Sequence, residues 1–248
     1  MNGARTRFGH GLGGVTRERI ADGVWLVRGG FPKAIANVYL LEDGAGVTLF
    51  DAGFRMMAPG LARAAAGLGG ITRVVLGHAH EDHRGAAPSL GVPIWCHRDE
   101  VASAGAPRID YYNLGAIPSP LVRLGFRVAL PLFDGGPCAI DRALEEGDAV
   151  AGFTVVSLPG HAPGQIGLWR EADRLALTTD CFYTLNPMKV TLPFGGPIPT
   201  CACFDHDHDQ ALASLRKLAA LEPAQAWPGH ARPVLGAVRA TLTEALAG

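Results

Sequence analysis

Residues 76–85 read LGHAHEDHRG, and they place three histidines and two acidic residues in one short stretch. An apolar run that is typical of a buried strand precedes this motif directly. Imidazole and carboxylate are usual ligands of a borderline metal ion such as zinc, whereas an ordinary polar loop has no need of three imidazoles. The stretch therefore predicts a metal site at a strand end. Its polar side chains are His78, His80, Glu81, Asp82 and His83.

Three further segments end an apolar run with a side chain that can bind metal. His161 closes a Leu-Pro-Gly-His segment, Asp180 closes Leu-Thr-Thr-Asp, and His230 closes Trp-Pro-Gly-His. Alone, each has an ordinary explanation as a turn histidine or as an exposed acid at a strand end. Functional sites of layered α/β folds collect at the carboxyl ends of strands. Together with the first motif, these residues supply enough ligands for two metal centres that share one carboxylate.

This set of motifs resembles the metallo-β-lactamase superfamily, from the strand at residues 37–39 through Asp51-Ala-Gly to the last Pro-Gly-His. The resemblance implies an α/β fold, the four-layer αββα sandwich of the metallo-β-lactamase type, with the metals at one edge between the sheets. It also implies the ligands. His78, His80 and His161 would hold the first metal, Asp82, His83 and His230 the second, and Asp180 would bridge the two.

The same resemblance implies two divalent metal ions, with zinc as the default and iron or manganese as alternatives. A water that bridges the ions would lose a proton near neutral pH and act as the nucleophile, with Asp82 in a catalytic role. Asp51 would orient a ligand from the outer shell, although an aspartate before Ala-Gly equally suits a turn.

The resemblance also implies a small ester, thioester or lactone as the substrate. Zinc β-lactamases generally lack the bridging aspartate, so the presence of Asp180 argues against that activity. Glyoxalase II enzymes carry a long C-terminal helical region after the last histidine, and the motifs matched here do not include one. The nearest functional parallel is to the acyl-homoserine lactonases, in which a tyrosine follows the bridging aspartate by three residues. Tyr183 occupies that place and would donate a hydrogen bond to the oxyanion, or else pack on the sheet edge. Glu81 and the segment 105–148 depart from the lactonases.

A rival activity remains open. Persulfide dioxygenases of the same superfamily use a single iron, and positions matching their ligands are present as His78, His161 and Asp180. The alternative is therefore a mononuclear iron oxygenase of sulfur compounds.

Composition limits the partners and the compartment. The net charge is −1 with no basic block, which argues against nucleic-acid binding. There is no secretory signal and no apolar run of about 18 residues, so we expect a cytoplasmic enzyme that acts on a small-molecule substrate without a membrane partner. The cysteines are odd in number and scattered, and we expect them to be reduced. They are Cys96, Cys138, Cys181, Cys201 and Cys203.

The element pattern favours a single domain over residues 1–248, with two layers of sheet flanked by helices. Pro and Gly residues interrupt the segment 105–148, so we expect an irregular insertion there that shapes substrate choice. An amphipathic helix is predicted over 207–221, with Asp205 or Asp207 as its cap and with His206 and His208 in solvent rather than on a metal. Strands are predicted at 23–28, 36–42, 46–50, 74–77 and 93–97 and again from Phe153, and further helices at 59–68, 98–104 and 237–246.

Overall fold

The computed structural model describes residues 5–30, 35–44, 46–109, 112–185 and 196–247. The chain forms two compact units, each assembled from several segments of the sequence. Whether they act as the single predicted domain stays a prediction. Unit 1 comprises Met1–Cys96, Val101–Ile109 and Phe126–Ala143, and unit 2 comprises His97–Glu100, Asp110–Gly125 and Leu144–Gly248.

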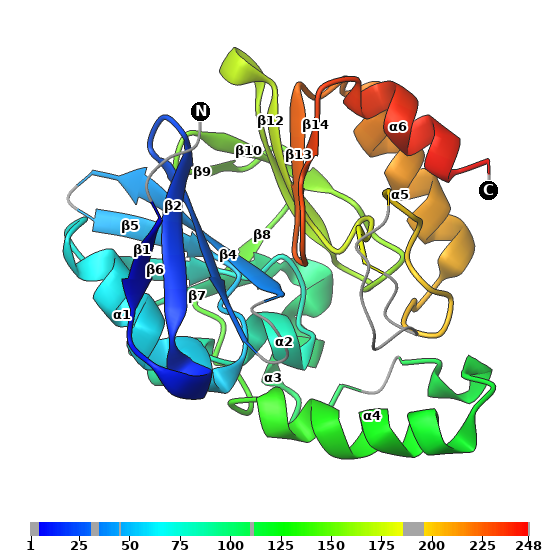
Figure 1. The fold of residues 1–248 in the computed structure, drawn as a ribbon, viewed down its shortest axis with the longest axis horizontal. Coiled ribbons are helices and arrows are strands. Elements are labelled where there is room, and N and C mark those ends of the chain that lie inside the picture. Colours follow the sequence, from blue (N-terminus) through cyan, green and yellow to red (C-terminus); the bar gives the residue numbers. More distant parts are fainter. Residues whose placement is uncertain (1–4, 31–34, 45, 110–111, 186–195, 248) are drawn as a thin grey trace. The chain divides into compact units, whose positions relative to one another are not determined.

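The first unit is built on a sheet that has eight strands within the described residues, in the order in which they follow one another in the sequence. Strands up to β5 run antiparallel to their neighbours, whereas β5, β6 and β7 are parallel (Figure 1). Every residue of β5 is buried, as expected for a strand with parallel pairing. The strands are β1 (Thr6–Phe8), β2 (Val15–Ala21), β3 (Val24–Gly29), β4 (Ala36–Asp43), β5 (Gly46–Phe50), β6 (Ile71–Val75), β7 (Ile94–His97) and β8 (Arg142–Leu144).

Helix α1 (Ala58–Ala66) connects β5 to β6 and packs on β1, β2 and β6. A proline occupies its first turn, where the missing N–H costs nothing. Leu61, Ala64 and Ala65 recur at helical spacing and are buried. This crossover makes β5 and β6 parallel, so the carboxyl ends of both strands meet at one edge of the sheet.

Two short helices follow β6 and β7, namely α2 (Glu81–Arg84) and α3 (Val101–Gly105). Arg84 is fully buried and joins them. Its guanidinium donates to the carbonyl oxygens of Ser103 and Ala104, at 2.9 and 3.0 Å, and forms a two-pronged ion pair with Asp134 at 2.7 and 3.0 Å. A buried arginine is tolerated only with this degree of pairing, so Arg84 fixes α2, the helix that forms the second half of the HAHEDH motif.

The second unit contains a sheet of six described strands in the order β14-β13-β12-β11-β10-β9. Its pairs are antiparallel except β12 and β13, which α5 connects as a parallel crossover. The strands are β9 (Ala149–Val150), β10 (Phe153–Ser157), β11 (Ile166–Arg170), β12 (Leu175–Thr179), β13 (Gln225–Pro228) and β14 (Val234–Leu235).

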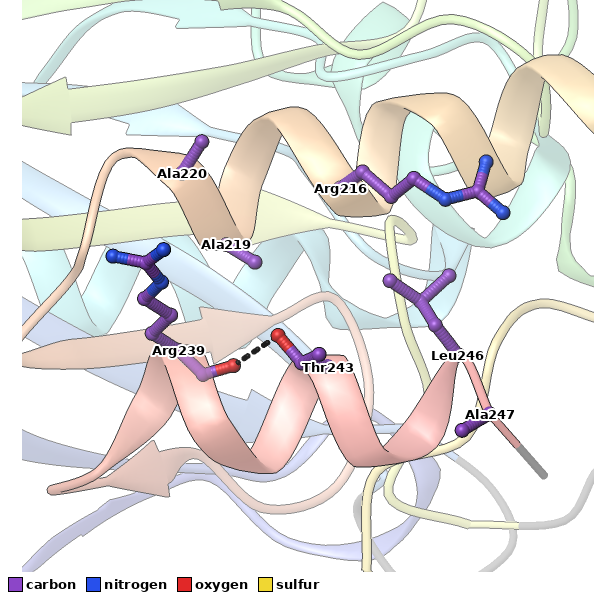
Figure 2. Close-up of a pocket in the computed structure, with 7 residues that line it drawn as sticks. All are labelled: Arg216, Ala219, Ala220, Arg239, Thr243, Leu246 and Ala247. Atoms are coloured by element: carbon purple, nitrogen blue, oxygen red, sulfur yellow. Dashed lines mark hydrogen bonds between the residues drawn. The ribbon is translucent and has the colours of Figure 1, made fainter.

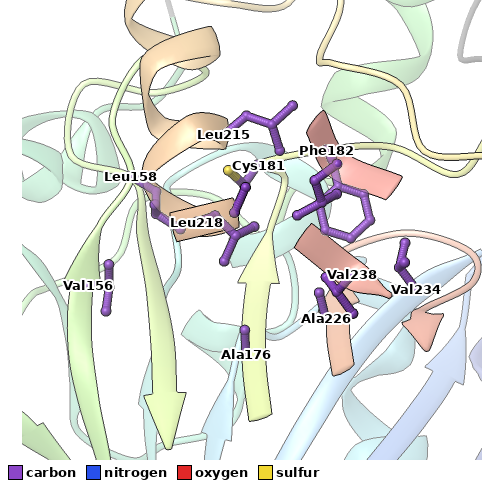
Figure 3. Packing of buried hydrophobic residues seen from close by; sticks show 12 residues of the cluster. Val156, Leu158, Ala176, Cys181, Phe182, Leu215, Leu218, Ala226, Val234 and Val238 are labelled. Carbon is purple, nitrogen blue, oxygen red and sulfur yellow. The ribbon is translucent and has the colours of Figure 1, made fainter. Parts of the chain in front are cut away.

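Helices α5 (His208–Ala220) and α6 (Val238–Ala245) lie side by side against this sheet (Figure 1). The core between them is apolar, and Figure 3 shows its side chains converging from both helices and from the strands. Asp207 caps α5, because its carboxylate accepts the backbone N–H of Gln210 at 3.0 Å, so one of the two predicted caps is confirmed. The core residues include Val156, Leu158, Ala176, Phe182, Leu215, Leu218, Ala226, Val238 and Leu242.

The expectation of an irregular insertion over 105–148 was wrong for its centre. Residues Pro120–Phe133 form α4, a helix of 14 residues. Gly125 and Pro131 obscured it in the sequence, because both lower helix propensity strongly, and Pro131 stands within the last turn. The helix carries four exposed aliphatic side chains, which are Leu121, Leu124, Val128 and Leu132.

The remaining predicted elements agree with the structure in type, with ends that differ by one to a few residues. The α/β class expected from the sequence is therefore confirmed. Short 3₁₀ turns complete the described elements: Gly11–Gly13, Arg55–Met57, Ala87–Ser89, Arg98–Glu100, Leu114–Ala116 and Glu171–Asp173.

Candidate metal centre

The HAHEDH motif lies just after β6 in unit 1, and its three histidines are gathered and buried. His78, His80 and His83 are at most 3% exposed. The ring centroids of His78 and His83 are 4.0 Å apart, and those of His78 and His80 are 4.5 Å apart. His78 Nε2 and His80 Nδ1 approach to 3.0 Å. Three imidazoles this close together in a buried place suit shared metal ligation better than they suit solvation.

Asp51 stands behind this group at the end of β5. One carboxylate oxygen accepts the backbone N–H of Gly77 at 2.7 Å, and the other lies 2.8 Å from His83 Nδ1. The carbonyl of His83 in turn accepts the N–H of Ala52 at 2.7 Å. The contact predicted for an outer-shell acid is present. A carboxylate at Nδ1 leaves Nε2 of His83 as the ligand atom.

Asp82 occupies the first turn of α2, and its side chain is 24% exposed. Its carboxylate oxygen lies 3.9 Å from His83 Nε2. This is the Nε2 side of His83, which is the side expected to face a metal. The neighbouring Glu81, the residue that departs from the lactonases, is buried.

The second unit supplies His161, Asp180 and His230, each just past the end of a strand. Asp180 Oδ2 lies 3.7 Å from His161 Nε2 and 3.3 Å from His230 Nε2. Because β12 and β13 are parallel, Asp180 and His230 leave the sheet at the same edge. The backbone N–H of Gly229 donates to the carbonyl oxygen of Thr179 at 2.7 Å, and this hydrogen bond connects the two turns. One carboxylate oxygen thus lies between two imidazole nitrogens.

His161 has a partner that the sequence did not reveal. Its Nδ1 lies 2.9 Å from Asp205 Oδ1, and the Asp205 side chain has no exposed surface. The sequence predicted Asp205 only as a possible cap of α5. Three aspartates alternate with two histidines over residues 205–209, and this pattern does not distinguish the roles of the three acids. His208 was expected in solvent, yet its Nδ1 lies 2.6 Å from Asp205 Oδ2 and its side chain is 39% exposed.

Three residues beside these side chains adopt left-handed backbone conformations that are unfavourable for residues other than glycine. Asp51 has φ 63°, Thr179 has φ 42°, and Ala231 has φ 62°. For a β-branched residue such as Thr179 this is a marked outlier. Such conformations cost about 1–3 kcal/mol each and gather where a site fixes the backbone.

Tyr183 is 5% exposed and lies near two of the histidines of unit 2. Its ring centroid is 6.1 Å from that of His161 and 6.2 Å from that of His230. Backbone hydrogen bonds to Ile198 in both directions hold the residue in place. The ring therefore lies beside the predicted ligands, as a residue that contacts substrate requires.

The cysteines are not all reduced, contrary to expectation. Cys201 and Cys203 form a disulfide within the turn that leads to Asp205. Cys96, Cys138 and Cys181 are buried free thiols. Burial raises the pKa of Cys181, and the nearby Asp180 and Asp205 charges raise it further. The Cys181 thiol therefore stays protonated and packs in the core rather than acting as a nucleophile.

A surface cleft of about 360 Å³ lies between α5 and α6 (Figure 2). Three of its seven lining residues are alanines, and its two arginines, Arg216 and Arg239, point toward opposite ends of the cleft. Arg239 also forms an ion pair with Glu222. None of the residues that line this cleft is a predicted ligand, so it does not compete with the metal-ligand residues as a catalytic site.

Residues 32–230 match the model of the metallo-beta-lactamase superfamily. The chain belongs to this superfamily. The predicted α/β fold of the metallo-β-lactamase type is confirmed by the match and by the two large sheets.

Similar proteins agree with that placement. The probable metallo-hydrolase YflN of Bacillus subtilis is 29% identical over 87% of this chain and 88% of its own length. The hydroxyacylglutathione hydrolase GloC of Haemophilus influenzae is 30% identical over 49% of this chain and 55% of its own. The crystal structure of TTHA1623 in a di-iron-bound form is 28% identical, with a TM-score of 0.60 over 83% of this chain and 92% of that chain.

The protein is thus a metal-dependent hydrolase of the metallo-β-lactamase superfamily. The residues present fit a divalent metal, because every predicted ligand offers a nitrogen or oxygen atom, with no thiolate among them. No helix among the described residues is long and apolar enough to cross a membrane.

Proposed function

We propose that the protein is a dinuclear metal hydrolase that cleaves a small ester, thioester or lactone. One group of ligands is His78, His80 and His161, and the other is Asp82, His83 and His230, with Asp180 bridging. The ions are zinc by default, with iron or manganese as alternatives. The superfamily match and the di-iron form of TTHA1623 support two ions, and the activity named for GloC supports a thioester among the substrate classes.

The observation that carries the proposal is the position of Asp180. One of its oxygens lies 3.7 Å from His161 Nε2 and 3.3 Å from His230 Nε2. Since a zinc–oxygen or zinc–nitrogen bond is about 2.0–2.2 Å long, ligand atoms that share an ion lie at about these separations. His161 and His230 belong to different proposed groups, so a carboxylate close to both supports a bridging role for Asp180.

When bound, two adjacent divalent ions supply a water molecule that loses its proton near neutral pH, and they polarise the substrate carbonyl. The protein's own groups complete the reaction. Tyr183 donates its phenol hydrogen to the oxyanion as water adds to the carbonyl carbon. Asp82, being partly exposed, would accept the proton that the water gives up and would pass it to the leaving alcohol or thiol as the carbon–oxygen or carbon–sulfur bond breaks.

Metal analysis together with a substrate panel tests this proposal. Protein loaded with zinc and freed of excess metal should retain about two ions per chain and hydrolyse at least one class among aryl esters, lactones and glutathione thioesters. Protein that retains a single iron and consumes oxygen with a persulfide would contradict the proposal and favour the sulfur oxygenase.

The bridging role has its own test. Asp180→Ala should remove more metal than His230→Ala, because the aspartate would touch both ions and the histidine only one. Equal retention in the two variants would show that Asp180 does not bridge.

We further propose a cytoplasmic enzyme with a small-molecule substrate and no nucleic-acid or membrane partner. The net charge of −1 and the lack of a basic block in the sequence support the expectation of no nucleic-acid partner.

A further inference from the structure

We infer that Asp205 is a positioning residue that fixes the tautomer of His161 and so presents Nε2 of that imidazole to the metal. The inference rests on the proposed function, because it gives His161 its role as a ligand. Among the described residues, Asp205 is the acid that lies against Nδ1 of His161, at 2.9 Å.

The chemistry follows from the two groups involved. A neutral imidazole carries one N–H, and an ionised carboxylate only accepts hydrogen bonds. With Asp205 at Nδ1, the hydrogen resides on Nδ1 and the lone pair on Nε2 is available for a metal. The nitrogen that carries the lone pair is on the correct side, because Nε2 of His161 is the atom that lies 3.7 Å from Asp180 Oδ2.

Asp205 is itself held rigidly. Its second oxygen accepts the hydroxyl of Thr200 at 3.0 Å and lies 2.6 Å from Nδ1 of His208. Its backbone N–H donates to the carbonyl of Cys201 at 3.2 Å, inside the turn that the Cys201–Cys203 disulfide closes. Both carboxylate oxygens and the backbone are thereby engaged in a fully buried place.

The turn that carries His161 is fastened to the same segment. His206 N–H donates to the carbonyl of His161 at 3.2 Å, and Asp207 N–H to that of Gly160 at 2.8 Å. Gly160 has φ 126°, and a Cβ there would come within 2.0 Å of the Ala211 nitrogen in α5. Only glycine allows this approach. Side chain and backbone together fix the orientation of His161 relative to α5.

Unit 1 contains the same arrangement. Asp51 Oδ2 lies 2.8 Å from Nδ1 of His83, as Asp205 does from Nδ1 of His161. In each unit, a buried carboxylate thus contacts Nδ1 of one predicted ligand histidine. The recurrence of one arrangement in two unrelated strands and turns supports a role in ligand orientation.

The test compares Asp205→Asn with Asp207→Asn in the full-length protein. Asp205→Asn keeps the size of the side chain and removes its charge. Asp207→Asn makes the same chemical change two residues away, where the side chain only caps α5 and asparagine caps equally well. Zinc affinity, measured by competition with a chromogenic chelator, should fall about 10–100-fold for one of two ions in Asp205→Asn. It should be unchanged in Asp207→Asn.

A second measurement needs no metal. Long-range ¹H–¹⁵N spectra of the apo protein should show the proton of His161 on Nδ1 in the parent and in Asp207→Asn. They should show a shift toward the Nε2–H form in Asp205→Asn. An unchanged tautomer, or zinc bound as tightly as in the parent, overturns the inference.

The design separates this inference from the proposed function. A parent that binds fewer than two ions contradicts the dinuclear proposal, and the tautomer in the apo protein still decides the role of Asp205. If Asp205→Asn does not fold, Thr200→Val removes one of the hydrogen bonds that hold the carboxylate. That variant should give a smaller loss of zinc affinity in the same direction, and parental affinity would overturn the inference.

Discussion

Tyr183 lies beside His161 and His230, and its phenol is the group that we propose stabilises the oxyanion. Tyr183→Phe keeps the ring and its packing and removes only the donor. Loss of one such donor typically costs about 10²–10³ in turnover, and a metal that shares the oxyanion reduces that share, so we expect a drop in kcat of roughly tenfold. Metal content and Tm should not change. Parental turnover on a preferred substrate would make Tyr183 a packing residue.

A second prediction at this scale concerns Cys138. Burial raises the pKa of its thiol to about 11, although the nearby Arg84 charge opposes the rise. The folded state therefore holds the thiol proton more tightly than the unfolded chain does. The stability this provides is complete below about pH 9 and is lost as the pH rises toward about 11. The total is on the order of 3 kcal/mol, since the pKa rises by about two units and one unit is worth about 1.4 kcal/mol.

Urea unfolding of the parent and of Cys138→Ala at several pH values measures this effect. The advantage of the parent over the variant should shrink between about pH 9 and pH 11. Groups that titrate in both proteins cancel in the difference. A constant difference across that range would show that the thiol is not desolvated in the fold.

At the scale of elements, substitutions in helix α4 should change the free energy of unfolding much less than a core substitution in helix α5. Leu121, Leu124 and Val128 of α4 are more than half exposed. Replacing any one of them with glutamine should change the free energy of unfolding by less than about 0.5 kcal/mol. Leu218 of α5 is 1% exposed and packs in the core of unit 2, so Leu218→Ala should cost about 2–5 kcal/mol.

Denaturant titration of these variants decides the matter. A loss of more than about 1 kcal/mol at an α4 position would mean that another surface covers that helix in solution.

Helix α4 also shows where sequence patterns lose their predictive value. The other long helices contain no proline beyond their first turn, whereas α4 contains Gly125 and Pro131, whose low helix propensity concealed an otherwise regular apolar spacing. Local propensity is only a weak prior, and the surrounding fold can override it. The strands were easier to predict, because continuous buried runs such as that of β5 have few other interpretations.

In the site, too, residues within contiguous motifs were predictable from the sequence, whereas contacts between distant positions were not. The HAHEDH motif and the two Pro-Gly-His turns are contiguous signatures, and Asp51 lies in a recognisable Asp-Ala-Gly turn. The contact of Asp205 with His161 joins positions 44 residues apart. A single sequence contains no signal for such a contact. The Cys201–Cys203 disulfide was not predicted for a different reason. Only one residue separates the two cysteines, and this spacing matches none of the usual disulfide or metal patterns.

At the scale of the whole molecule, the seven proposed ligands divide between the units, with four in unit 1 and three in unit 2. If one dinuclear centre uses them all, metal binding must stabilise the entire chain. Free zinc at about 100 times its Kd would add about 2.7 kcal/mol. For a chain of this length that corresponds to a rise in Tm of about 5–10 °C.

Thermal scans of the zinc-loaded protein with and without a chelator measure this rise. Asp180→Ala should lose most of it, while Asp207→Asn should keep it. A Tm that does not respond to chelation would show that metal binding does not stabilise the folded chain, and it would count against the proposed ligand set.

The left-handed backbone at Thr179 and Ala231 affects which substitutions this enzyme would accumulate under selection for thermal stability alone. Glycine adopts these conformations without steric penalty, and asparagine adopts them more easily than threonine or alanine. A library selected only for survival of heating is therefore expected to accumulate glycine or asparagine at both positions. Deep sequencing before and after selection would reveal the enrichment. The same clones, assayed for hydrolysis, should on average be poorer catalysts, because a backbone free to relax no longer holds Asp180 and His230 at their present separation.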